Sequence, residues 1–180
     1  LAQARERARS ISCTNNLKQL ALTQQLYADT YDEQFTPCFD ARWGDPSWQY
    51  WPTLLKGFSM GPDNPVYTCP SRVYPVTSEA DPHYGMACGV IKQMRGLSSC
   101  AGTPIDLKLS TFRQPTRTVL LAESAGLAPI PDRGQWRTQQ YGVANLWYSS
   151  PHSSGKGRNI ALVDGHVEQF IGRADSTLYC

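Results

Sequence analysis

The first 32 residues show a helical pattern of apolar positions and contain neither glycine nor proline. Apolar residues recur there at the spacing that places side chains on one helix face. They are Leu1, Ala4, Ala8, Ile11, Cys13, Leu17, Leu20, Tyr27 and Tyr31. The pattern predicts a long amphipathic helix that ends before Pro37, because a residue that precedes proline leaves the helical region. Arg5, Arg7 and Arg9 leave little apolar surface near its start, so we expect that end to project beyond the globular body.

Apolar runs in the second half of the chain predict strands. Residues 117–123 are almost wholly apolar and β-branched at their start, which predicts a buried strand. Residues 159–163 and 166–171 flank Asp164-Gly165. An Asp-Gly pair between two apolar runs favours a hairpin with a type I′ turn, since both residues tolerate positive φ.

The segment between the helix and these strands is rich in aromatic residues and proline. Residues 51–55 predict a helical turn with Pro52 near its start. Residues 66–69 predict a short strand that stops at Pro70. One helix followed by separate strands is typical of an α+β fold. We therefore expect a long helix packed on a small antiparallel sheet with long irregular loops.

Composition and charge exclude several functional classes. Lys and Arg number 17 and Asp and Glu 15 among the 180 residues, a balance that gives no reason to expect a nucleic-acid partner. No run approaches the ~18 apolar residues of a membrane span. The sequence lacks the G-x-S-x-G, H-E-x-x-H, P-loop and G-x-G-x-x-G motifs. We therefore expect no enzymatic activity.

Six cysteines are scattered along the chain and none forms a C-x-x-C pair. They are Cys13, Cys38, Cys69, Cys88, Cys100 and Cys180. An even, scattered set favours disulfides, which indicates an oxidising compartment such as a periplasm. Sequence does not fix the connectivity. One hypothesis pairs Cys88 with Cys100 across a short loop and Cys13 with Cys69, which would tie the helix to the sheet. Cys38 and Cys180 would then form the third bond.

Four further residues offer the groups of a zinc or acid–base cluster. They are Glu123, His152, Asp164 and His166. Against such a cluster, Asp164 is explained locally as a turn residue, and the side chains of Asp164 and His166 are expected to diverge around Gly165. No local zinc motif is present. We expect a hydrogen bond between His152 and the hairpin instead.

Two motifs resemble a known family. Residues 4–20, followed by residues 27–32, resemble the segment just after the membrane helix of type II secretion pseudopilin-like proteins, which are abundant in planctomycete, verrucomicrobial and lentisphaeral bacteria. His152 with Asp164-Gly165 resembles the C-terminal H-x9-DG signature of the same group, here with 11 intervening residues. Cys69-Pro70-Ser71 and Ala122-Glu123-Ser124 resemble landmarks between these motifs.

The resemblance implies a structural subunit of a type II secretion or type IV pilus-like filament. Residues 1–33 would be the C-terminal half of a pilin-type helix, and residues 34–180 the head with which it forms one domain. The full-length protein would carry a leader cut by prepilin peptidase and an apolar helix of ~20 residues in the inner membrane. The head would face the periplasm, and its partners would be other pseudopilin subunits and the secretion machinery.

The resemblance also makes calcium the one cofactor to consider, because major pseudopilins often hold this ion near the C-terminus. Calcium prefers several oxygen ligands, and Asp132, Asp164 and Asp175 are available. No loop of the EF-hand type is present.

A secreted or surface-anchored binding module is the alternative function. Its carbohydrate or protein ligand would stack on the aromatic cluster between Trp43 and Trp51, which includes Trp48 and Tyr50. We expect these rings to pack against the long helix instead, because aromatic residues dominate small cores and exposed aromatic patches are uncommon.

Overall fold

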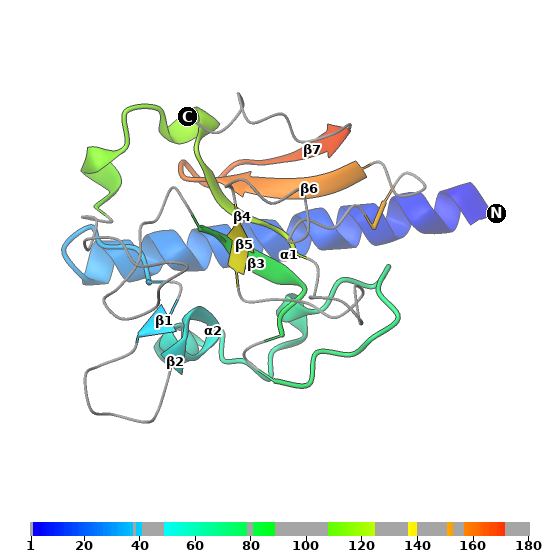
Figure 1. Cartoon of the computed structure of the whole chain (residues 1–180), viewed down its shortest axis with the longest axis horizontal. Coiled ribbons are helices and arrows are strands. Elements are labelled where there is room, and N and C mark those ends of the chain that lie inside the picture. Colours follow the sequence, from blue (N-terminus) through cyan, green and yellow to red (C-terminus); the bar gives the residue numbers. More distant parts are fainter. Residues whose placement is uncertain are drawn as a thin grey trace.

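A computed structural model of the chain consists of one long helix with a sheet lying along it (Figure 1). It describes residues 2–37, 39–40, 49–78, 81–88, 108–124, 137–139, 151–152 and 157–171. The helices are α1 (Ala2–Thr30) and α2 (Trp51–Leu54), and the strands are β1 (Phe39–Asp40), β2 (Gln49–Tyr50), β3 (Tyr84–Cys88), β4 (Val119–Glu123), β5 (Arg137–Gln139), β6 (Gly157–Leu162) and β7 (Val167–Ile171). Single 3₁₀ turns are η1 (Lys56–Phe58), η2 (Pro65–Tyr67), η3 (Leu109–Thr111) and η4 (Pro115–Arg117). The predicted α+β class is confirmed.

Helix α1 is docked on the sheet along only part of its length. Its buried residues begin at Cys13 and continue to Ala28. The apolar positions nearer the start do not pack: Ala4 and Ala8 are exposed, and so is Ile11. Figure 1 shows the N-terminal turns extending past the end of the sheet, as the sequence predicted. The helix ends at Thr30, and Asp32 and Glu33 then take positive φ angles of 53° and 63°.

The main sheet has five strands in the order β5-β3-β4-β6-β7. Four of them, β3, β4, β6 and β7, pair antiparallel as predicted. The short strand β5 pairs in parallel with β3 at the sheet edge, which the sequence pattern did not predict. All five residues of β4 are buried, because this strand lies in the middle of the sheet against α1.

The predicted hairpin of β6 and β7 is confirmed, but its turn is not type I′. Gly165 N donates to Leu162 O at 2.9 Å, and Gly165 has a φ of 86°. Asp164 is not among the described non-glycine residues with positive φ, whereas type I′ needs two such residues. The loop therefore has three residues, and only the last of them, Gly165, has a left-handed backbone conformation. A Cβ on Gly165 would lie 2.7 Å from Gln25 Nε2, so glycine also lets the turn approach α1.

The predicted strand at residues 66–69 is wrong, because η2 occupies this position. Pro65 suits the first helical position, and the Asn64 side chain accepts a hydrogen bond from Val66 N. The apolar pattern at Val66 and Tyr67 reflects their burial in the core and not a strand. The helical turn predicted at residues 51–55 is confirmed as α2.

The aromatic residues between α1 and β3 contribute to the core. Trp51 is fully buried and packs edge-on against Tyr67, with ring centroids 5.4 Å apart. Tyr50 packs against the same core cluster. Trp43 and Trp48 lie outside the described residues. Trp51 and Tyr50 therefore follow the expectation of core packing and are not free to stack on a ligand.

Among the described parts of the chain, none of the helices combines the length and the apolar character that crossing a membrane requires.

Candidate functional site

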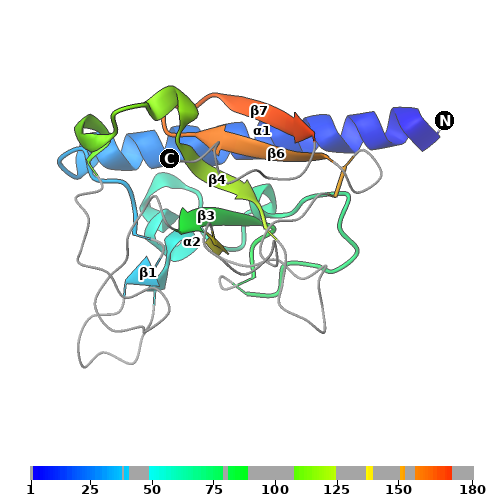
Figure 2. The same cartoon turned by 45° about the horizontal axis from the view of Figure 1, so that its top comes forward.

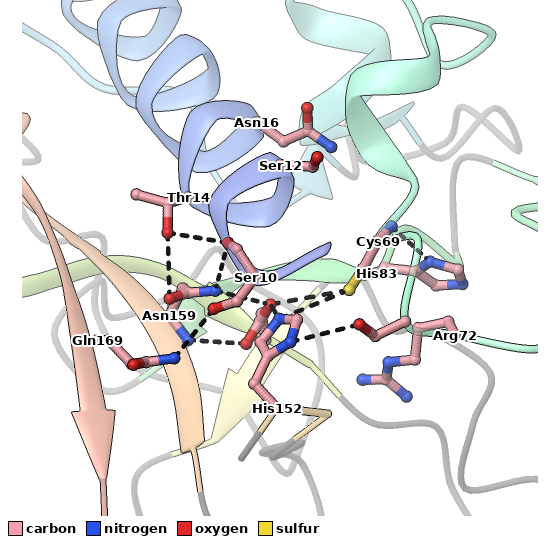
Figure 3. Close-up of polar contacts among 12 residues, drawn as sticks. Ser10, Ser12, Thr14, Asn16, Cys69, Arg72, His83, His152, Asn159 and Gln169 are labelled. Carbon is pink, nitrogen blue, oxygen red and sulfur yellow. Dashed lines mark hydrogen bonds and ion pairs between the residues drawn. The ribbon is translucent and has the colours of Figure 1, made fainter. Parts of the chain in front are cut away.

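Four side chains of the types that bind metals meet in the interior between α1 and the sheet. They are Cys13, Cys69, Glu123 and His152, and their ligand atoms all lie within 4.8 Å of one another. All four residues are buried. Figure 3 shows Cys69 and His152 pointing toward one another beside α1. We call this group the buried cluster.

The fold brings each member to the cluster from a different segment. Cys13 is the first buried residue of α1. Glu123 ends β4, where Ser124 N donates to His83 O. The backbone of Cys69 donates to His83 Nδ1 at 2.9 Å, which fixes the segment after η2. His152 forms an antiparallel bridge with Gly157 at the start of β6, with backbone hydrogen bonds of 3.1 and 2.9 Å.

The Glu123 carboxylate is fully buried and fully paired. Its Oε1 lies 2.7 Å from His152 Nε2 and accepts a longer bond of 3.3 Å from Asn159 Nδ2. Its Oε2 accepts from the backbone N of Asn159 at 2.7 Å. A buried carboxylate is tolerated only with such partners, so Glu123 holds both β6 and His152 in place.

His152 links this carboxylate to α1. Its second ring nitrogen, Nδ1, lies 2.8 Å from Glu6 Oε1 and 3.3 Å from Ser71 Oγ. Burial alone would lower the His152 pKa, but hydrogen bonds with Cys69, Glu123 and Glu6 outweigh it and raise the pKa to about 10. Each ring nitrogen of His152 therefore has a glutamate oxygen within hydrogen-bonding distance.

The two thiols differ in acidity because they hydrogen-bond to one another. The bond from Cys13, helped by His152, outweighs burial and lowers the Cys69 pKa to about 6. The same bond and burial raise the Cys13 pKa far above its ordinary value. The shared hydrogen bond therefore moves the two pKa values in opposite directions. Both cysteines are free, so the hypothesised Cys13–Cys69 disulfide is absent, although the two residues do join α1 to the body.

The cluster only partly matches the residues singled out in the sequence. Glu123 and His152 meet, and His152 bonds to the first residue of the hairpin as expected. Asp164 and His166 do not join them. These two pair with each other at the exposed turn, with Nδ1 and Oδ2 2.8 Å apart. The four-residue cluster is therefore absent, as the sequence analysis expected, but the expectation that the Asp164 and His166 side chains diverge is wrong. Although slight burial opposes it, bonding to His166 lowers the Asp164 pKa.

The other sequence hypotheses reach parts of the chain that the structure does not describe. Of the calcium candidates, Asp132 and Asp175 lie outside the described residues. Asp164 belongs to no group of three potential ligands within them. The four remaining cysteines are Cys38, Cys88, Cys100 and Cys180. Of these, the structure describes only the backbone of Cys88.

Sequence reasoning missed Glu6 and Asn159 as members of this region. Glu6 lies about two helical turns before Cys13 and thus on the same helix face, which was a usable signal. Asn159 directly precedes the apolar run of residues 160–163, and a buried polar residue in a strand calls for partners. Its Oδ1 accepts from Thr14 Oγ1 at 3.2 Å, so it also binds α1.

The members of the buried cluster are shielded from solvent. Cys13, Cys69 and Glu123 have no exposed surface. A cavity of about 720 Å³ lies along the first turns of α1 and has His152 and Asn159 in its wall. The His152 side chain is only 1% exposed, so the wall separates the two sulfurs from that cavity.

Comparison with known proteins yields one match. Residues 2–49 match a family described as a protein of unknown function (DUF1559), which is less than half of the chain. This range includes residues 4–20, on which the pseudopilin-like resemblance mainly rests. No curated protein and no solved structure matches the chain.

Replacing Asn159 tests how much the hydrogen bonds of its side chain to Glu123 and Thr14 stabilise the fold. Asn159→Ala removes the side-chain hydrogen bonds to Glu123 and Thr14 from a buried site, so we expect a loss of about 2 kcal/mol. Gln169→Ala is the matched control, because Gln169 bonds Ser10 Oγ on α1 but is exposed, and it should change stability by less than about 0.5 kcal/mol. Urea unfolding measures both, and equal effects would contradict the role of the buried contacts.

Proposed function

We propose that the chain is a non-enzymatic, pilin-like structural subunit of a type II secretion or type IV pilus-like filament. The observation that carries this proposal is the division of α1. Its 29 residues form one continuous helix, of which the C-terminal part is docked and the N-terminal part projects. Figure 2 shows the same projection beyond β6 and β7 from a second direction.

A stripe of exposed apolar residues on α1 supports assembly through this helix. Ile11, Leu22 and Leu26 are 61%, 45% and 55% exposed. They fall within about 60° of one another around the helix axis, on the side away from Leu17 and Leu20. Apolar surface of this kind marks an interaction site. The partners would be neighbouring subunits packed helix against helix in a heterologous, non-closing assembly.

The family match supports the same function, since it covers α1 and continues to residue 49, and thus includes residues 4–20, on which the pseudopilin-like resemblance mainly rests. In the full-length protein an apolar helix would precede the projecting turns of α1 and anchor the subunit in the inner membrane. Arg5, Arg7 and Arg9 are exposed and would lie beside the lipid headgroups, which attract cations. The head would then face the periplasm.

Processing of the full-length gene product tests the class directly. Co-expression with a prepilin peptidase should give a membrane-bound form whose intact mass has lost a short leader and gained one methyl group. The control is the same expression with an inactive peptidase, which should leave the leader in place. A product cut by an ordinary signal peptidase, or not cut at all, would refute the filament assignment.

The exposed stripe can be tested in the same cells. Replacing both Leu22 and Leu26 by Gln should leave stability within about 0.5 kcal/mol, since both residues are exposed. It should also reduce the share of chain that chemical cross-linking recovers in high-mass assemblies, because apolar helix contacts are lost. Val73→Gln is the control, as Val73 is 83% exposed but lies outside α1. Unchanged cross-linking of the double variant would count against helix-mediated assembly.

A further inference from the structure

We propose that Cys13, Cys69, Glu123 and His152 bind one zinc ion, which fastens α1 to the sheet. This site is independent of the proposed filament function and goes beyond it. It would be a structural centre with four protein ligands drawn from four segments of the chain.

The spacing of the ligand atoms suits tetrahedral zinc. Zn–S bonds of about 2.3 Å and Zn–N or Zn–O bonds of about 2.0–2.1 Å place a sulfur about 3.5 Å from a nitrogen or oxygen ligand. Cys69 Sγ lies 3.8 Å from Glu123 Oε1 and 3.9 Å from His152 Nε2. His152 Nε2 and Glu123 Oε1, 2.7 Å apart, would separate slightly as zinc replaces the proton between them.

The ligand types select zinc over calcium. Two cysteine sulfurs, an imidazole nitrogen and a carboxylate oxygen are all donor types that zinc accepts, and four such ligands complete a tetrahedral site. Calcium would require six or more oxygen ligands, which this cluster does not offer. Zinc would displace the protons of the Cys13 thiol and of His152 Nε2, so binding would release protons to solvent.

The surrounding contacts already orient the ligands. A zinc-bound histidine usually donates its other ring N–H to a carboxylate, and His152 Nδ1 lies 2.8 Å from Glu6 Oε1. A zinc-bound carboxylate is itself hydrogen-bonded, and Glu123 Oε2 accepts from Asn159 N. These bonds leave His152 Nε2 and Glu123 Oε1 directed toward the two sulfurs.

A disulfide between Cys13 and Cys69 is the alternative to the zinc site. The two exclude each other, because both require the same two sulfur atoms. A disulfide accounts for the two cysteines alone. It gives no reason for a buried imidazole and a buried carboxylate to converge on them. The complete cluster therefore favours the metal.

Zinc titration of the reduced, metal-free chain against a chromophoric chelator tests the proposal. We expect the wild type to take up one Zn²⁺ per chain. Cys69→Ser should weaken binding by at least about 100-fold, because loss of a ligand exceeds the ~10–100-fold effect of losing an outer contact. Glu6→Gln retains all four ligands and should weaken binding by ~10–100-fold. His166→Ala removes an exposed histidine outside the cluster and should bind as the wild type does.

Two further measurements distinguish loss of the zinc site from loss of the fold. Circular dichroism should show that Glu6→Gln is folded, since Glu6 is only partly buried. Co²⁺ in the wild type should give the visible bands of a tetrahedral cobalt–thiolate centre, and these should vanish in Cys69→Ser. Failure of the reduced wild type to bind zinc would overturn the proposal. So would another metal at stoichiometric amount, or a Cys13–Cys69 disulfide mapped in protein isolated from its native compartment.

Discussion

The pairing of the buried Glu123 carboxylate is the constraint on which the arrangement of helix and sheet depends. A fully buried carboxylate without partners would cost several kcal/mol, so the fold must bring donors to it. Asn159 supplies them from β6, and His152 supplies one from the segment that bridges to β6. Because His152 also bonds Glu6, satisfying this one carboxylate joins α1 to two neighbouring strands.

The position of the buried cluster also explains why α1 has two different parts. Cys13 is the first residue of the helix with no exposed surface, so the cluster marks the start of the docked part. Beyond it, Leu17 and Leu20 continue the contact by ordinary apolar burial. Before it, the helix contacts the rest of the chain through polar groups of Glu6 and Ser10 and has no buried residue. In the proposed filament, a helix held at this point would present its exposed face to neighbouring subunits without loosening the head.

Elements with a clear hydrophobic period could be predicted from the sequence, namely α1, β4 and the hairpin of β6 and β7. The strand predicted at residues 66–69 failed because Val66 and Tyr67 are buried in a 3₁₀ turn, which a short apolar run does not distinguish from a strand. Motifs singled out Glu123 and His152. The disulfide hypothesis placed Cys13 beside Cys69, as the structure does, although both are free. The convergence of these two with Glu123 and His152 could not be predicted, because it depends on how α1 packs over segments far away in the chain.

Hydrogen exchange in His152→Ala tests most directly whether the buried cluster is what holds α1 on the sheet. The variant removes the side chain that connects Glu6 to Glu123. If the cluster is the joint, amides in the first half of α1 should lose much more protection than those of β4 and β6, because a detached helix is only marginally stable. Unchanged protection in α1 would contradict this account, since it would show that apolar burial alone holds the helix. Equal loss in the helix and the strands would contradict it too, since the helix would then not detach on its own.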